Sequence, residues 1–257
     1  MIRRAEHRDI GKITPLFAGW QESCIWSCLQ EVMGELYIRD GKEPESVMAI
    51  LGDFSFFAGE PDEELLCFKP EAYRDDFIIM VPQNASWAER IERCYTDRAK
   101  KVTRYAIKKE PGIFDREHLE SIVRALPPEY TLKRIDKEIY EWCRTESWCR
   151  DWCGNYKSYE MYEKLGMGVV CLKDGAVVAG AASYSTYRDG IEIEIDTKEE
   201  FRRRGLASAC GARLILDCME RGLYPSWDAQ NKWSVALAEK LGYHYERDYT
   251  AYEIRGY

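Results

Sequence analysis

Residues 191–207 constrain the fold of this chain more than any other stretch. Ile and Glu alternate in the first part of the stretch, which is the period of a β-strand with two unlike faces. A basic run of three arginines follows and ends at Gly205. Apolar residues then recur at helical spacing from 208 to 221, and Gly222 is a plausible stop. The stretch therefore predicts a strand that leads through a basic turn into a helix.

Such a turn has the features of a phosphate-binding site. The first N–H groups of a helix have no internal partner, and the helix dipole favours an anion beside them. A glycine at this point lets the backbone come close to a ligand. A solvated basic turn fits the same residues, and the turn is not a P-loop, because the Gly-Lys-Ser/Thr ending is missing.

Two sequence blocks carry a resemblance to a known family. Arg202-Arg-Arg-Gly-Leu-Ala207 resembles the R/Q-x-x-G-x-G/A signature of the GNAT superfamily of acyl-CoA N-acyltransferases. Asn231-Lys-Trp-Ser-Val-Ala-Leu-Ala-Glu-Lys-Leu-Gly-Tyr243 resembles the N-x-x-A/S-x-x-L-(Y/A)-x-K-x-G-F/Y helix of the same superfamily. The resemblance covers residues 127–257. Within the superfamily, the segment 225–231 and the extended first half look most like the group around the zwittermicin A self-resistance acetyltransferase.

The resemblance implies an α+β (mixed α/β) fold in two parts. Residues 127–257 would form a GNAT acetyltransferase domain, with a central mixed, mostly antiparallel sheet flanked by helices. Residues 1–126 would form a degenerate GNAT-like α/β domain that lacks the coenzyme A signature and either shapes the acceptor pocket or only buries surface. Pro127-Pro128 is the best linker candidate, because consecutive prolines cannot continue a helix.

Apolar runs and turn residues predict the elements along the chain. Strands are expected at 49–57, 65–68, 77–81, 102–107 and 226–229, a hairpin at 166–184, and helices at 86–95, 115–126, 156–165 and 232–241. Cys143, Cys149 and Cys153 cluster and raise the question of a metal site. They lack the CxxC pairs and the nearby His of common zinc sites, so no metal is predicted.

Composition and charge bound the partners. A net charge of −8 disfavours general nucleic-acid binding and suits a cationic small molecule better. The chain has no long uncharged apolar run and no secretory signal at its N-terminus, so we expect a cytoplasmic protein that is not inserted in a membrane. A monomer and a homodimer are both compatible with the sequence.

The resemblance also implies which residues hold acetyl-CoA, the expected co-substrate. Its pyrophosphate would lie on the signature turn. The Ile195 N–H would lie near the acetyl carbonyl, Thr197 would pair with the pantetheine arm, and the second block would add Asn231 and Ser234. The residues of the turn are Arg202, Arg203, Arg204, Gly205, Leu206, Ala207 and Ser208.

The catalytic residues are less constrained. A carboxylate could take the proton of the acceptor amine, and the candidates are Asp228 first, then Glu194 and Glu192, which could equally form a solvated sheet face. Many GNAT enzymes place a Tyr in the last helix as the general acid, and the matching residue here is Ala238.

The sequence therefore predicts an acetyl-CoA-dependent N-acetyltransferase that acts on a primary amine of a small molecule by direct attack in a ternary complex. Ala238 and the degenerate first half keep a second class open, a non-catalytic CoA-binding sensor or interaction module. A protein N-acetyltransferase is a third possibility. The resemblance to a self-resistance enzyme points towards amine-bearing antibiotics as acceptors.

Overall fold

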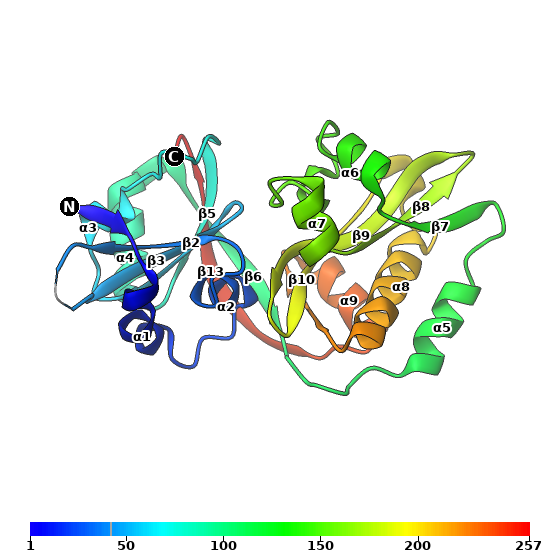
Figure 1. Cartoon of the computed structure of the whole chain (residues 1–257), viewed down its shortest axis with the longest axis horizontal. Coiled ribbons are helices and arrows are strands. Elements are labelled where there is room, and N and C mark those ends of the chain that lie inside the picture. Colours follow the sequence, from blue (N-terminus) through cyan, green and yellow to red (C-terminus); the bar gives the residue numbers. More distant parts are fainter. Residues whose placement is uncertain (42) are drawn as a thin grey trace. The chain divides into compact units, whose positions relative to one another are not determined.

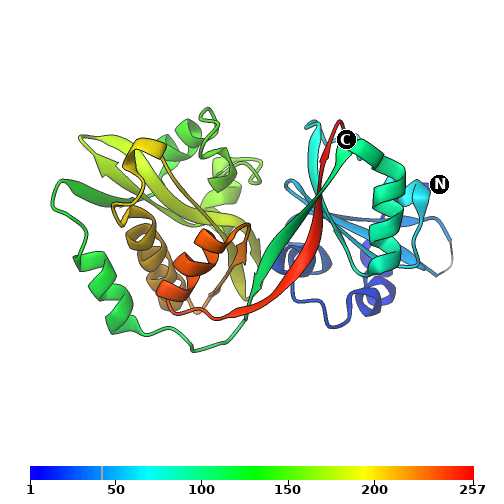
Figure 2. The same ribbon diagram turned by 180° about the vertical axis from the view of Figure 1, so that it is seen from behind.

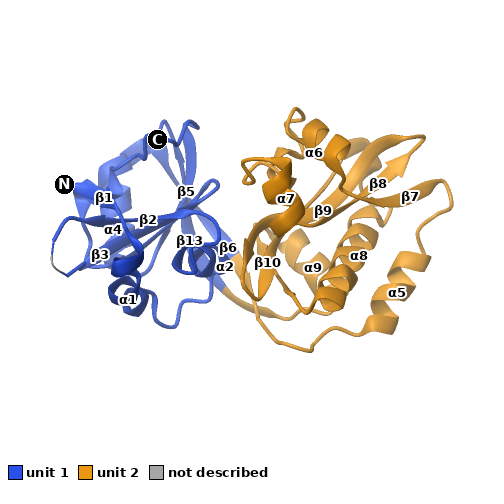
Figure 3. Cartoon of the chain, viewed as in Figure 1, with its two compact units in different colours: residues 1–104, 248–257 blue, residues 105–247 orange. Residues whose placement is uncertain are grey.

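The computed structural model describes residues 1–41 and 43–257, and these form two compact units. The first consists of residues 1–104 and 248–257, and the second of residues 105–247 (Figure 3). The helices of the described residues include none that is long and apolar enough to cross a membrane.

The second unit is a five-stranded sheet with helices on both faces (Figures 1 and 2). The strand order is β11-β10-β9-β8-β7, and all neighbours are antiparallel except β10 and β11. The strands are β7 (Tyr130–Arg134), β8 (Gly168–Lys173), β9 (Ala176–Tyr187), β10 (Gly190–Thr197) and β11 (Tyr224–Ser226). The sheet is thus mixed and mostly antiparallel, as the sequence predicts.

Three helices of this unit lie on one side of the sheet, where α8 packs against the strands and α5 packs on α8, and two lie on the other side. The first group buries the main apolar core and consists of α5 (Arg116–Arg124), α8 (Leu206–Arg221) and α9 (Lys232–Lys240). The opposite face carries α6 (Lys137–Cys143), α7 (Tyr159–Leu165) and the short 3₁₀ turn Arg150–Trp152 between them. Close approach on this face needs Gly180, because a Cβ there would lie about 2.5 Å from the Trp152 ring.

The first unit has a sheet of order β1-β2-β3-β4-β5-β13-β6. Its strands are β1 (Ile2–Arg4), β2 (Glu35–Arg39), β3 (Ser46–Leu51), β4 (Phe54–Gly59), β5 (Phe77–Pro82), β6 (Ala99–Ile107) and β13 (Tyr245–Arg255). Its helices are α1 (Ile10–Ile13), α2 (Ser23–Leu29), α3 (Glu63–Leu66) and α4 (Ala85–Tyr95). The sequence predicts the start of α4 well, because Asn84 caps it by accepting from the Trp87 N–H.

The two units repeat one order of elements. In each, a strand and two helices precede three antiparallel strands, a helix, a strand parallel to the third, and a further helix. The helix after the third strand differs. In the first unit it is α3, a four-residue helix with Glu63 and Glu64 in its first turn and a capping side chain, Asp62. The Asp62 side chain already accepts from a backbone N–H at the start of α3, and the acidic residues of the first turn repel an anion. Among its described residues, the first unit therefore lacks a phosphate site at this helix.

The units are bounded differently from the domains expected at 1–126 and 127–257. Residues 105–126 belong to the second unit, because α5 packs on α8 and buries Leu119 in the core of that unit. Residues 248–257 belong to the first unit, because the end of β13 pairs with β5. The other long strand, β6, crosses the boundary too, and its end at Tyr105 and Ala106 pairs with β12 (Asp228–Ala229).

Three expected strands are wrong. The strand expected at 49–57 is instead a pair of antiparallel strands, β3 and β4, joined by a turn at Gly52 and Asp53. Leu65 and Leu66 are the last residues of the helix α3, which Asp62 caps, and residues 67–68 follow it without forming a strand. The strand expected at 226–229 breaks at Trp227 into β11 and β12, which pair with different strands. Local apolar content could not reveal the outcomes at 65–68 and 226–229. The helix α3 depends on its cap, and the split at Trp227 depends on the strand that each half meets.

A buried acid fixes the first strand of the second unit to its longest helix. Asp217 of α8 is 3% exposed and accepts from the Arg134 guanidinium at 2.9 and 3.2 Å, and Arg213 donates to it as well. Burial by itself would raise the pKa of Asp217, but the hydrogen bonds from the two arginines outweigh it and lower the pKa.

We therefore expect Asp217→Asn to destabilise the protein by about 2 kcal/mol, since hydrogen bonds to charged groups contribute about 1.5–3 kcal/mol. Because the folded pKa is depressed, the stabilisation is present at neutral pH and is lost as the pH falls through the folded pKa. Calorimetry should show a lower melting temperature at pH 7 and a smaller difference in acid. Glu220→Gln, which alters a more exposed partner of the same arginines, should change little.

Candidate functional site

The sheet of the second unit opens beside β10. Strand β11 pairs with β10 only from Gly190 to Glu192, and the chain then turns away at Trp227 into β12. Beyond Glu192, β10 continues to Thr197 with β9 on one side and, within residues 1–41 and 43–257, no strand on the other. This leaves a stretch of β10 edge that can pair with an extended ligand.

The register with β9 shows which backbone groups face the opening. The Lys198 N–H donates to the Val178 carbonyl at 3.0 Å, and residues of an antiparallel pair alternate between facing the partner strand and facing away from it. Ile195 and Thr197 therefore point their N–H and carbonyl groups away from β9. The side chain of Thr197 adds a buried hydroxyl oxygen with no hydrogen-bond partner among the described residues.

The N-terminus of α8 lies at the end of the same strand and turn. Gly205 is its N-cap residue, with a left-handed backbone (φ 81°) and no side-chain capping hydrogen bond. The N–H groups of Leu206, Ala207 and Ser208 come first in the helix and have no acceptor within it. A Cβ built on Gly205 would meet no atom of the described residues within 4 Å, so the turn faces open space.

The three arginines of the turn have different contacts. Arg202 Nε donates to the Thr197 carbonyl at 3.3 Å and closes the loop between β10 and α8. Arg204 donates to the Glu200 carbonyl at 2.9 Å. Arg203 holds its guanidinium carbon 4.6 Å from the centroid of the Trp233 ring. All three are exposed, so their positive charge remains available to an anion at the helix terminus.

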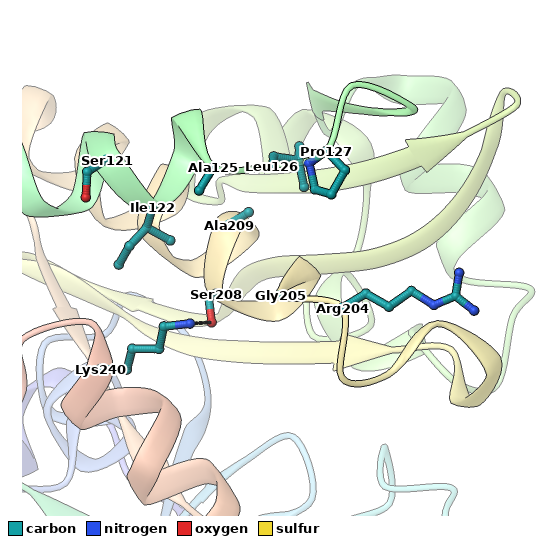
Figure 4. A pocket seen from close by; sticks show the side chains of 10 residues that line it. All are labelled: Ser121, Ile122, Ala125, Leu126, Pro127, Arg204, Gly205, Ser208, Ala209 and Lys240. Carbon is teal, nitrogen blue, oxygen red and sulfur yellow. Dashed lines mark hydrogen bonds between the residues drawn. The ribbon is translucent and has the colours of Figure 1, made fainter.

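A pocket of about 250 Å³ adjoins this turn (Figure 4). The Lys240 ammonium points into it and donates to the Ser208 hydroxyl at 3.2 Å. Sequence reasoning did not select Lys240, although this residue matches the pattern lysine of the second block. It also assigned no role to α5, whose residues line one side of the pocket. The lining residues are Ser121, Ile122, Ala125, Leu126, Pro127, Arg204, Gly205, Ser208, Ala209 and Lys240.

The predicted residues Asn231 and Ser234 organise the start of α9. Asn231 caps this helix, and its Oδ1 accepts from the Ser234 N–H at 3.0 Å. The Ser234 hydroxyl accepts from the Trp227 indole N–H at 3.0 Å, at the point where β11 gives way to β12. Both polar groups of Ser234 are thus engaged within the protein, and they fix the helix against the opening in the sheet.

The predicted carboxylates occupy two sides of the opening. Glu192 is buried and Glu194 is half-buried on β10, on the sheet face opposite α8. The alternate residue Ile195 faces α8 instead, and a Cβ on Gly211 of that helix would lie 3.1 Å from it. Asp228 lies on β12, across the opening, where it pairs in register with Ala106.

Asp196 is a further carboxylate on β10, and sequence reasoning missed it. Burial, followed by the nearby charge of Asp151, raises the pKa of Asp196 to about 6. It stands opposite Gly180 in the register, on the face that carries Trp152. The alternation Glu-Ile-Glu-Ile-Asp continues through this residue, so the signal was the same period that placed Glu192 and Glu194 on one face.

Neither residue 238 nor its tyrosine neighbour offers an obvious proton donor. Ala238 is fully buried. Tyr243 is 2% exposed, and its hydroxyl already donates to the Pro225 carbonyl at 2.6 Å. Burial raises the pKa of Tyr243 well above its usual value. Both residues serve the core of the second unit.

Comparisons with known proteins agree with this geometry. The profile described as GNAT acetyltransferase matches residues 14–252. An uncharacterized N-acetyltransferase of Bacillus subtilis (strain 168), YdfB, is 27% identical over 247 residues, which cover 89% of this chain and 88% of the relative.

Solved structures are similar along the whole chain. A GCN5-related N-acetyltransferase-like protein from Streptococcus suis 89/1591 is 46% identical, with a TM-score of 0.91 over 98% of this chain and 100% of its own. A tandem GNAT protein from the clavulanic acid biosynthesis pathway shares the fold at 11% identity, with a TM-score of 0.57 over 100% of this chain and 98% of its own.

Proposed function

Because this chain belongs to the GNAT acetyltransferase family, we propose that it transfers an acetyl group from acetyl-CoA to a primary amine of a small molecule. The proposal rests on one observation: two sets of backbone groups that lack a hydrogen-bond partner in a helix or strand lie next to each other. The uncapped N-terminus of α8 suits an anion, and the open edge of β10 suits an extended chain with amide groups.

The residues present fit acetyl-CoA. The N–H groups from Arg203 to Ser208 would hold its pyrophosphate, where Gly205 leaves room for it. Ile195 and Thr197 would pair with the pantetheine arm, and the buried Thr197 hydroxyl would find a partner there. When bound, the coenzyme supplies an acetyl group activated as a thioester. The Ile195 N–H would donate to the carbonyl oxygen as negative charge develops on it.

We assign direct attack by the amine rather than a covalent acetyl-enzyme. A two-step reaction would need an accessible nucleophile, and cysteine is the strongest candidate at neutral pH. The cysteines of the second unit are all buried. Direct attack instead needs a neutral amine, which a carboxylate can provide by accepting its proton.

The proposed base is a carboxylate bordering the opening. Asp196 is favoured by its pKa of about 6, because a base is most effective when its pKa lies near the working pH. Asp228, Glu194 and Glu192 stay as candidates from the sequence. Asp228 lies across the opening and would also suit an anchor for a cationic acceptor.

The acceptor class follows from charge and from resemblance. The chain is acidic overall, and four carboxylates lie on β10 and β12 beside the opening, which favours an amine that carries further positive charge. The resemblance to the zwittermicin A self-resistance group points in the same direction, towards amine-bearing antibiotics.

A panel of amines tests the proposal. The intact protein is incubated with acetyl-CoA and with polyamines, amino sugars, amine-bearing antibiotics or peptides. Release of the coenzyme thiol is followed by absorbance, and the product is identified by mass spectrometry. We expect amine-dependent thiol release with at least one small cationic amine. Acetylation of peptides alone would instead support a protein N-acetyltransferase.

A further inference from the structure

One aromatic side chain of the second unit is unusually exposed beside the proposed coenzyme site. Trp233, in the first turn of α9, is 73% exposed. An isolated exposed aromatic residue needs no explanation by itself. This one lies in contact with the turn that precedes α8, and its indole contributes little to the core.

The contact is made by Arg203, the middle arginine of that turn. Its guanidinium carbon lies 4.6 Å from the centroid of the Trp233 ring, within the range of a cation–π interaction. Arg203 also has a left-handed backbone, with φ 63°, which is uncommon for a residue other than glycine. Strained residues of this kind gather at ligand-binding sites.

The start of α9 is capped, so the backbone that carries the indole has a defined position. Asn231 caps the helix through the Ser234 N–H, and Trp227 donates to the Ser234 hydroxyl. An exposed aromatic surface beside a positive charge suits a planar, electron-rich ring, which can stack on both the indole and the guanidinium.

We propose that Arg203 and Trp233 bind the purine base of the acyl donor, which is part of the donor's nucleotide. The inference rests on the proposed function, because it assumes that a nucleotide-bearing thioester occupies the turn before α8. Its pyrophosphate would lie on N–H groups that begin at Arg203 itself, so the base would need to reach only a short way to the ring.

The pocket between α5 and α8 is an alternative binding site for the purine base. Its lining includes Arg204, Lys240 and Ser208. Charged and polar groups of this kind suit a phosphate better than a neutral base. The exposed face of Trp233 offers the stacking surface that this pocket lacks, because no aromatic side chain of the described residues lines it.

The test separates the contribution of the purine base to binding from that of the rest of the acyl donor. Binding of acetyl-CoA and of acetyl-4′-phosphopantetheine, which lacks the nucleotide, is measured by calorimetry with the intact protein and with Trp233→Ala. Stacking on an aromatic side chain contributes enough that its loss should weaken acetyl-CoA binding about tenfold. The affinity for acetyl-4′-phosphopantetheine should stay unchanged, and Trp233→Phe should retain most of the affinity for acetyl-CoA.

Tyr245→Ala is the matched control, because Tyr245 is another exposed aromatic residue of the second unit, at 37%. It should leave both affinities unchanged. Equal weakening of both ligands in Trp233→Ala would overturn the proposal, since it would show a structural effect on the turn. Unchanged acetyl-CoA binding in that variant would overturn it too. If neither ligand binds the intact protein, the proposed function fails together with the inference.

Discussion

Gly205→Glu should abolish acetyl-CoA binding, while the protein stays folded. The carboxylate would stand where the pyrophosphate is proposed to lie, and juxtaposed like charges cost several kcal/mol, with about 1.4 kcal/mol for each tenfold loss of affinity. We therefore expect the dissociation constant to rise by about 100-fold or more. The new side chain meets open space, because a Cβ there has no neighbour within 4 Å among the residues described.

The same helix provides a matched control. Gly222 ends α8 with φ 68°, close to the 81° of Gly205, and a Cβ there also has no described neighbour within 4 Å. Gly222→Glu therefore introduces the same side chain with similar backbone strain, roughly 25 Å away at 1.5 Å per residue. The two variants should lose similar stability, and only Gly205→Glu should lose affinity. Equal affinities, measured by calorimetry, would show that the coenzyme does not use this turn.

Asp196→Asn should lower turnover about 100-fold, because general base catalysis contributes 10²–10⁴-fold. Burial raises the pKa of Asp196 to about 6, so the rate of the intact protein should rise with pH through about 6 as the base loses its proton. The variant should lose this acid limb and keep its affinity for acetyl-CoA. Steady-state kinetics between pH 5 and pH 8 measure both effects.

The same substitution should stabilise the fold at neutral pH. A raised pKa means that the folded protein binds the proton of Asp196 more tightly than the unfolded chain does, so stability falls as the pH rises from about 4 to about 6. Asparagine carries no charge and avoids that loss. The melting temperature of Asp196→Asn should exceed that of the intact protein at pH 8, and the gain should shrink towards pH 4.

Asp228→Asn decides between the candidate bases. If Asp196 is the base, Asp228→Asn should raise the KM of a cationic acceptor and retain the acid limb near pH 6. If Asp228→Asn removes the acid limb while Asp196→Asn keeps it, the base is Asp228, the first candidate from the sequence, and Asp196 has only a structural role.

Local sequence was sufficient for the parts of the fold that are stabilised locally. The alternation in β10, the glycines that bound α8 and the Asn84 cap of α4 each act within a few residues, and each element forms where the pattern predicts it. The split at Trp227 and the placing of residues 248–257 in the first unit depend on pairing between strands far apart in the chain. No local pattern reports such pairing.

The candidate site was predictable to a similar degree. The turn from Arg202 to Ser208 and the residues Ile195 and Thr197 come together at one end of β10 and α8, because a single strand–turn–helix carries them all. Asp196 was missed because its raised pKa arises from burial and from the charge of Asp151, which lies 45 positions earlier in the sequence. Lys240 and the pocket-lining residues of α5 were missed because only the packing of separate helices brings them next to the turn.

Titration calorimetry of the intact protein with acetyl-CoA tests the central claim most directly. The second unit has an uncapped helix N-terminus, that of α8, beside an open strand edge, whereas the matching helix of the first unit, α3, is acidic and capped by Asp62. We therefore expect saturable binding of one acetyl-CoA per chain. Absence of binding, or binding of two molecules per chain, would contradict the proposed site.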